Sequence, residues 1–369
     1  MRKFELPPPP ADVTRQTYDA WLRRRFGRDN PEEMTNPSWV WFVRDRLWPG
    51  RAADIMGASD SQDVFMSRAR GAEPRWCFSR YGQSETRLPD GRRVFIGGEH
   101  EDFYDPDFCI YNDLTVITPG GEVEIFGYPR DVFPPTDFHA ATLVGGRIAI
   151  TGNLGYAGER HQGMTQVCFV SLENWAFEPI RLTADGPGWI HKHSSSLVDD
   201  DAAIVVRGGL IDTDDRLLRN SDDWRLDLAS LTWECLVRRD WPTFEFRRTD
   251  EEGLHLFEAS SAAFRRQYPD FRDDESEWEK SLDDPLRLDV YERLYEFDGC
   301  GRPFDAFDNS LVTCVVVDAV VARFEEQSGG LVATFEGRPS DTSLRRATEE
   351  LRSRLAAIEQ AEVEVRQVR

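Results

Sequence analysis

Short apolar runs that follow tight polar turns recur through the middle of this chain, about every 55 residues. Leu88, Leu143 and Leu197 mark equivalent positions, and each precedes a turn rich in glycine, aspartate or proline. The apolar runs end in small residues, at 94–98, 148–152 and 204–209. Four residues before each leucine are Ser84, His139 and His193, and each unit ends with Val123, Phe177 or Trp233. This pattern predicts three copies of one unit built from short strands.

The segment before the repeats, 1–72, has helical rather than strand spacing. Asp12 can cap a helix that runs to Phe26, and Asn36-Pro37 starts a second helix. The second helix is apolar nearly all round, with several tryptophans, so we expect it to pack against the repeats.

We place the repeats at 73–246, and the composition changes after them. The stretch 250–298 is strongly acidic and contains a helix starting near Asp284-Pro285. Next, 311–324 is predicted to form one strand and 331–335 its hairpin return, followed by a helix capped by Asp341 and a last short strand. The segment 247–369 is therefore expected to hold an acidic linker and a small α/β domain.

Charge and composition limit the classes of partner. The formal net charge is -22, a surface that repels phosphate backbones, so we expect no nucleic-acid partner. No apolar run approaches the ~20 residues that span a bilayer, and the N-terminus lacks the apolar core of a secretory signal. We therefore expect a cytoplasmic protein with no membrane contact. Lysine is rare beside arginine, as in proteins from GC-rich bacterial-type genomes.

The cysteines show neither zinc-type nor disulfide-type spacing. None of the six forms a C-x-x-C pair, and most lie beside strand-like apolar residues. We expect buried, reduced thiols and no cofactor bound through them.

The repeat resembles the kelch motif of β-propellers. That pattern has a Gly-Gly pair after the second strand, then a Tyr-Asp and a late tryptophan. The third unit matches best, with Gly208-Gly209, Leu226-Asp227 and Trp233, and the first and second units keep Gly97-Gly98 and Gly152-Asn153. The resemblance covers somewhat under half of the chain. It implies four-stranded antiparallel blades, with the late aromatic residue filling the space between neighbours.

Three blades cannot close a ring alone, because kelch propellers usually have five to seven. An exposed blade edge must then be covered. The N-terminal helices, the C-terminal domain or a second copy of the chain could cover it, and further degenerate blades could lie within 247–340. The expected fold is mainly β, with kelch-like blades, a helical N-terminal segment and an α/β C-terminal part.

The resemblance also predicts where binding occurs. In a blade with strands A to D, the A–B and C–D turns share one rim, and the B–C and D–A loops share the other. The second set is long here, and long loops on a rigid rim commonly carry binding residues. Histidines and aromatic residues gather near these loops. The candidate binding residues are Glu99, His100, Tyr104, Phe108, Phe138, His139, Trp189, His191 and His193.

Three functions remain open from the sequence. The preferred interpretation is a non-catalytic module that binds a protein partner through the long-loop rim. The second is a metal-dependent enzyme on the same rim, with His100, His139, His191 and His193 as candidate ligands beside carboxylates. The third is a scaffold whose acidic stretch, 250–298, docks a basic partner. Motifs of serine hydrolases and zinc proteases are absent, which favours binding over catalysis.

Overall fold

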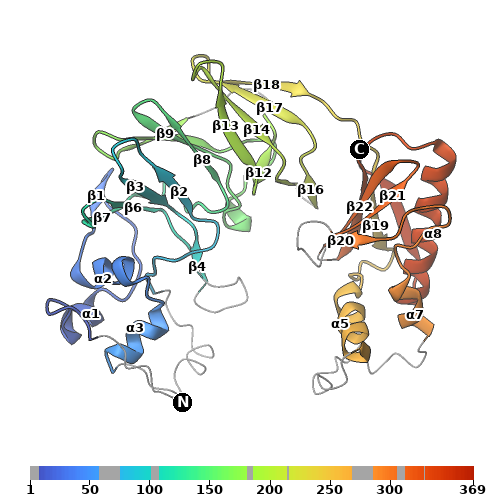
Figure 1. Ribbon diagram of the computed structural model, residues 1–369, viewed down its shortest axis with the longest axis horizontal. Coiled ribbons are helices and arrows are strands. Elements are labelled where there is room, and N and C mark those ends of the chain that lie inside the picture. The colour runs from blue at the N-terminus through green and yellow to red at the C-terminus, as the bar shows by residue number, and fades with distance from the viewer. Residues whose placement is uncertain are drawn as a thin grey trace. The chain divides into compact units, whose positions relative to one another are not determined.

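β-structure dominates the computed structural model, which describes residues 8–57, 75–100, 108–180, 186–213, 216–267, 286–305, 312–327 and 329–369 (Figure 1). The strands pair antiparallel. The chain divides into two units, Met1–Arg238 and Arg239–Arg369, which have separate hydrophobic cores. The expected mainly β class is confirmed.

Three four-stranded meanders occupy most of the first unit, and we call them the first, second and third repeat sheets. The first consists of β2 (Ser84–Arg87), β3 (Arg93–Ile96), β6 (Asp113–Ile117) and β7 (Val123–Gly127). The second consists of β8 (Ala140–Val144), β9 (Arg147–Thr151), β10 (Val167–Ser171) and β11 (Phe177–Ile180). The third consists of β13 (Ser194–Val198), β14 (Ala203–Arg207), β17 (Asp223–Asp227) and β18 (Thr232–Val237). In each sheet, strands consecutive in these series are hydrogen-bonded neighbours.

Alternation along the strands builds a core on each side of the second sheet. Ile148 and Ile150 of β9 pack toward the first sheet, whereas Ala149 packs toward the third. Phe177 and Trp233, the late aromatic residues of their units, lie in these two cores. Because successive side chains of a strand point to opposite faces, a sheet buried on both faces needs apolar residues at every position, as β9 has.

Three short helices cover the other face of the first sheet: α1 (Arg15–Ala20), α2 (Pro37–Asp45) and α3 (Pro49–Ile55). The Asn36 side chain caps α2 as predicted, accepting a hydrogen bond from the backbone N–H of Trp39. The indole of Trp39 stacks on Trp76 with ring centroids 4.5 Å apart, in one core with Phe95 and Ile125 of the sheet. The N-terminal helices therefore pack on the face of the first sheet that lies opposite the second sheet, as expected for the apolar second helix.

The first helix is shorter than predicted. Thr14, rather than Asp12, caps it in a reciprocal capping box with Thr17, and it ends at Ala20 instead of Phe26. The next residues leave the helix because their carbonyls bind elsewhere: Trp21 O accepts from the Trp39 indole and Leu22 O from the Trp76 amide.

One N-terminal segment also protects the outer edges of two sheets. β1 (Glu32–Glu33) adds a fifth strand to the first sheet by pairing with β7. Just before it, the Asn30 side chain forms the two backbone hydrogen bonds that a neighbouring strand would form with Phe177. Its Nδ2 donates to Phe177 O and its Oδ1 accepts from Phe177 N, both at 2.8 Å. Exposed strand edges invite unwanted pairing, and these contacts remove part of two such edges.

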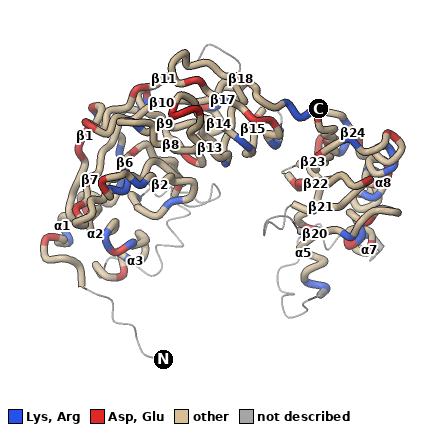
Figure 2. The backbone as a smooth tube through the Cα atoms, turned by 45° about the horizontal axis from the view of Figure 1, so that its top comes forward, with Lys and Arg blue, Asp and Glu red and all other residues tan. Residues whose placement is uncertain are grey.

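The third sheet ends the series with a polar face. Opposite its apolar side, β14, β17 and β18 carry acidic and basic residues (Figure 2). Arg225 pairs with Asp199 at 2.8 Å and with Asp227 at 3.3 Å, and Arg207 pairs with Asp223 at 3.2 Å. Such a face does not provide the hydrophobic burial that joins the first three sheets, so we see no apolar surface for a fourth sheet among these residues.

The second unit is an α/β domain around one antiparallel sheet. Its strand order is β20 (Phe304–Asp305), β21 (Val312–Val317), β22 (Val320–Gln327), β23 (Gly330–Phe335), β19 (Thr243–Arg248) and β24 (Val363–Gln367). Its helices are α5 (Leu256–Gln267), α7 (Leu286–Glu292) and α8 (Asp341–Glu359). The predicted helix after Pro339 and the last strand are present. β19 spans residue 246, where we expected the repeats to end, and belongs to this unit.

One predicted strand of this domain is two strands. The sequence suggests continuous strand over 311–324, but Asp318 and Ala319 form a tight turn between β21 and β22. Both residues have left-handed backbone, with φ of 47° and 61°. The turn has no glycine, which is why its sequence gave no signal.

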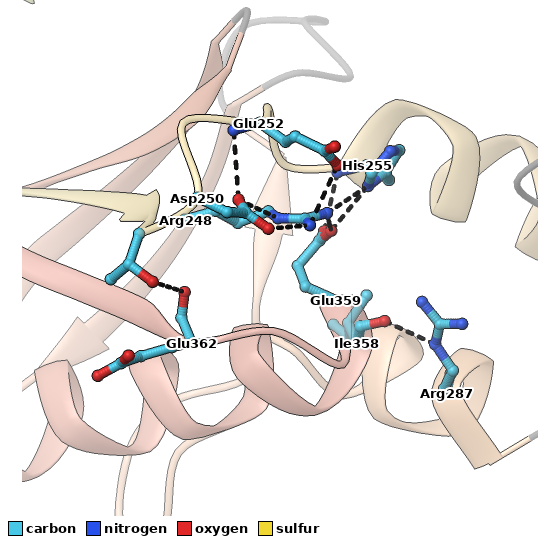
Figure 3. A network of polar contacts seen from close by, with 9 residues as sticks. Arg248, Asp250, Glu252, His255, Arg287, Ile358, Glu359 and Glu362 are labelled. Atoms are coloured by element: carbon cyan, nitrogen blue, oxygen red, sulfur yellow. Dashed lines mark hydrogen bonds and ion pairs between the residues drawn. The ribbon is translucent and has the colours of Figure 1, made fainter.

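An ionic network around the buried Glu359 connects three elements of the second unit (Figure 3). Glu359, whose side chain is 0 % exposed at the end of α8, accepts from Arg248 at 3.3 Å and from both the backbone N–H and Nδ1 of His255 at 2.8 Å. Arg248 also pairs with Asp250 and Glu252. One carboxylate thus connects β19, the start of α5 and the end of α8.

Candidate functional site

All long connections of the repeat sheets leave at one end, which we call the long-loop end. The β8–β9 turn is Gly145-Gly146, and the other hairpin turns of the meanders are similarly short. The connections after β3, β9 and β14 are long, as are those between sheets. Because neighbouring antiparallel strands reverse direction, these long segments must emerge together.

Parts of the long connections form further β-structure. β4 (Glu99–His100) pairs with β5 (Cys109–Ile110), and Tyr81 bridges to Glu99. β12 (Trp189–His191), β15 (Leu210–Asp212) and β16 (Leu217–Arg219) form a three-stranded sheet. The long-loop end is therefore built on hydrogen-bonded backbone over much of its described length.

One backbone feature repeats at the start of each repeat sheet. Gly82, Phe138 and Lys192 all have left-handed backbone, with φ of 62°, 47° and 55°. The Phe138 N–H donates to Gly82 O at 2.9 Å, and the Lys192 N–H donates to Phe138 O at 2.8 Å. Glycine adopts this conformation freely, whereas phenylalanine and lysine pay roughly 1–2 kcal/mol each. The Lys192 Nζ lies 4.4 Å from the centroid of the Phe138 ring.

The glycines of the repeat let neighbouring sheets approach at this end. A Cβ on Gly97 would lie 2.1 Å from Thr136 O, and one on Gly152 would lie 2.3 Å from Ile190 O and 2.5 Å from Cε1 of His193. Both glycines are left-handed as well. The Gly-Gly positions therefore have a mechanical role, and they bring the ring of His193 against the second sheet.

Three of the candidate histidines are buried and neutral here. His139 Nε2 lies 2.7 Å from Ser84 Oγ, and His193 Nε2 lies 3.1 Å from Thr151 Oγ1. Burial lowers the pKa of His139 and of His191 to about 3, and that of His193 to about 4. At neutral pH all three are uncharged, and His139 and His193 each make one hydrogen bond to a hydroxyl group.

An acidic pair and an arginine lie beside them. Asp137, 0 % exposed, accepts from the Gly155 N–H at 2.7 Å, and burial raises its pKa, while Glu99 and Arg160 act in the opposite direction. Arg160 donates to Leu154 O at 3.0 Å and binds the Asp212 carboxylate at 2.5 Å. Next to this ion pair is a cavity of about 430 Å³. Its lining consists of Ala157, Arg160, Gln162, Asp212, Thr213 and Arg216.

The structure gathers some of the candidate residues and not others. Phe138, His139, His191 and His193 lie together at the starts of the second and third sheets, and Glu99 forms a hydrogen bond with Asp137, the residue before Phe138. The remaining candidates behave differently. Trp189 is buried, with its indole N–H bound to Leu154 O at 2.9 Å. Phe108 packs on the Tyr156 ring, and Tyr104 lies outside the described residues.

The imidazole of His100 contacts the thiol of Cys77. Its Nδ1 lies 3.0 Å from Cys77 Sγ, and burial raises the pKa of that thiol to about 12. The six cysteines, all among the described residues, form no disulfide. Four of them are buried, as expected, whereas Cys235 and Cys300 are partly exposed. Within the described ranges, no three histidine, cysteine, aspartate or glutamate side chains are placed to hold one metal ion.

Sequence reasoning misaligned one repeat and left out several residues. We placed Ser84 at the position of His139 and His193, but strand pairing aligns it with Ala140 and Ser194. The error arose because the three hairpins differ in length, so counting back from the leucines slips by one residue. With the correct register, the repeat itself indicates further site residues: Tyr81, Asp137 and His191 are equivalent, as are Gly82, Phe138 and Lys192.

Comparisons with known proteins add little. No family model and no curated protein matches the chain. Among solved structures, one described as "Structure of YjhT" is similar over 46% of this chain and 54% of its own, with 10% identity and a TM-score of 0.33. The chain thus spans about half the length of that protein. No helix among the described residues has the length and apolar character needed to cross a membrane.

Proposed function

We propose that the first unit is a kelch-like, propeller-type binding module that engages a protein partner through its long-loop end. The three repeat sheets serve as blades, and the N-terminal helices replace a neighbouring blade. The strand order of the sheets, the glycine pairs and the aromatic residues between the sheets support this assignment.

The observation that carries the binding proposal is the strained pair Phe138 and Lys192. Both residues hold a left-handed backbone that Gly82 holds without cost at the equivalent position. Strain of this kind persists where the side chain has a use, and it concentrates in ligand-binding regions. Lys192 is exposed and Phe138 half-buried, so an aromatic ring and an ammonium group face solvent together.

Neighbouring side chains extend this surface. Tyr81 is 58% exposed and Met164 is 52% exposed, both on segments of the long-loop end. Aromatic and methionine side chains are enriched in protein interfaces, and tyrosine is frequent among the residues that dominate binding energy. The pocket beside Arg160 adds polar groups to this end. The same backbone thus presents different side chains in each repeat, which suits recognition of an irregular partner surface.

The test compares the two ends of the sheets. The full chain, tagged at one terminus, is used to capture partners as wild type and as Tyr81→Ala, Lys192→Ala and the combined variant. Arg87→Ala, at an exposed position of the short-turn end, is the matched control for Lys192→Ala. We expect a partner retained by wild type and control and lost at least tenfold by the combined variant. Recovery that is equal in all forms would rule out the long-loop end.

A further inference from the structure

Among the described residues, the three buried histidines of the long-loop end have no acidic hydrogen-bond partner. His139, His191 and His193 are 8 %, 2 % and 9 % exposed. Among the residues that the structure describes, neither ring nitrogen of His191 has a hydrogen-bond partner, nor does Nδ1 of His139 or of His193. Buried polar groups are nearly always paired, so this concentration is unusual.

Within the part of the chain that the structure describes, the charged groups that act on these imidazoles are positive. His191 on β12 faces Lys192 of its own segment, Arg160 of the β9–β10 connection and His193. His139, at the start of β8, faces His193 and the neutral hydroxyl of Ser84 on β2. His193 itself faces the neutral hydroxyl of Thr151 on β9. A proton added to any of these rings therefore meets like charge or a neutral group.

Two described carboxyl groups of the long-loop end, both near Arg160, do not offset that charge in acid. Asp212 is already bound to Arg160. Asp137 lies near Arg160 and next to Glu99 of β4, and burial raises its pKa, so it takes up a proton and loses its negative charge as the pH falls. Acid thus adds positive charge and removes negative charge in the same small volume.

We propose that the long-loop end opens when its buried imidazoles take up protons, so that mild acid loosens this end of the first unit while the second unit stays folded. The direction in which stability changes with pH follows from proton linkage. The folded state resists protonation and the opened state accepts protons near an ordinary histidine pKa of about 6.5, so stability is full above that pH and is lost below it. Release of the partner in mild acid is a consequence that also rests on the proposed function.

The second unit provides an internal contrast. His255 is half-buried, but its Nδ1 lies 2.8 Å from the Glu359 carboxylate (Figure 3). The same carboxylate also binds Arg248, whose Nη1 lies 3.4 Å from His255 Nδ1, so this ring has an acidic neighbour that the described surroundings of His139, His191 and His193 lack. Opening at moderate acidity is therefore expected only in the first unit.

Amide hydrogen exchange of the full chain measures this opening without any partner. The reporters are the N–H groups of Asn153, Leu154 and Lys192, which bind Ile190 O, Asp137 O and Phe138 O. Between pH 7 and pH 5, after correction for intrinsic exchange, we expect their protection to fall at least about a hundredfold, since each histidine that charges on opening contributes up to ~25-fold. Amides of β22 and β23 are expected to keep theirs.

Variants distinguish the protonation of these histidines from a non-specific effect of low pH on the first unit. The substituted side chains of His191→Leu, His139→Asn and His193→Asn are uncharged at every pH. His191→Leu alone is expected to reduce the pH dependence of amide protection, and the triple variant is expected to remove it. His161→Gln, at an exposed histidine of the same end, is the matched control and is expected to keep it. Unfolding of a variant does not obscure the result, because the wild-type titration is decisive alone. Protection in the wild type that is the same at pH 7 and pH 5, or that falls equally in both units, overturns the proposal.

Capture of the partner at each pH is a second measurement, independent of hydrogen exchange. If the proposed function holds, partner capture falls in parallel with protection as the pH is lowered. A pH-dependent loss of protection with unchanged capture would retain the opening and reject the long-loop end as the binding surface.

Discussion

The buried ion pair of Arg80 and Asp113 gives the sharpest stability prediction. The Arg80 side chain is 1% exposed and that of Asp113 is 9% exposed, and Nη2 lies 2.9 Å from Oδ2 within a bidentate pair. Arg80 also donates to Cys77 O and Gly97 O and lies over the Tyr111 ring at 3.5 Å, while the Trp76 indole donates to Asp113 at 2.7 Å. The pair thus joins the start of the first sheet to the tryptophan core.

Asp113→Ala leaves the guanidinium buried without a counter-charge. Breaking a buried pair in this way costs about 3–5 kcal/mol, a large share of the roughly 5–15 kcal/mol that stabilises a typical domain. Arginine keeps its proton in proteins at any physiological pH, so Arg80 cannot relieve the cost by becoming neutral. We therefore expect Asp113→Ala to lower the free energy of unfolding of the first unit by about 3–5 kcal/mol.

The assay is urea unfolding followed by hydrogen exchange at β3 and β6, which reports on the first unit alone. Asp19→Ala removes a pair with Arg15 whose side chains are 55% and 47% exposed, and it should cost under about 1 kcal/mol. The double variant Arg80→Met, Asp113→Leu removes both charges and should be more stable than Asp113→Ala alone. If Asp113→Ala costs no more than Asp19→Ala, the pair does not have the role assigned to it.

Two further changes test the packing of each unit. Gly152→Ala places a methyl group against Ile190 O and the His193 ring, so it should lower the melting temperature of the first unit by several degrees. Gly146→Ala, whose methyl group would meet nothing within 4 Å, should leave the melting temperature unchanged. Equal shifts for the two variants would contradict the close approach of the sheets at Gly152. Glu359→Ala removes the carboxylate shared by Arg248 and His255, while Arg248 keeps Asp250 and Glu252 as partners. The buried donors of His255 lose their acceptor, which should cost the second unit about 1–3 kcal/mol in urea unfolding. Glu349→Ala, at a side chain that is 66% exposed, should cost well under about 1 kcal/mol, and similar costs for the two variants would show that the network is dispensable.

Local patterns predicted much of this fold. Alternating apolar runs, the glycine pairs and the late aromatic residues indicated three equivalent sheets, and Asn36-Pro37 indicated the start of α2. These features depend on neighbours in sequence, through strand alternation, capping and the backbone freedom of glycine. They indicated also which end of the sheets carries the long connections.

Long-range contacts could not be predicted in the same way. Asn30 binds the backbone of Phe177, far along the chain, and no periodic pattern marks such a contact. Asp137 and Lys192 became site residues only when strand pairing corrected the repeat register, since one residue of slip moves a side chain to the other face. The polar face of the third sheet was readable from Arg207, Arg225 and Asp227, but only pairing showed that these residues share a face.

Site-specific photo-crosslinking tests the central claim most directly. A photo-reactive amino acid is placed at position 192 of the long-loop end and, in a second protein, at position 87 of the short-turn end, and both are irradiated in the presence of cell extract. The account predicts one discrete cross-linked protein from position 192, absent from position 87. The same products from both positions, or a discrete product from position 87 alone, would contradict it.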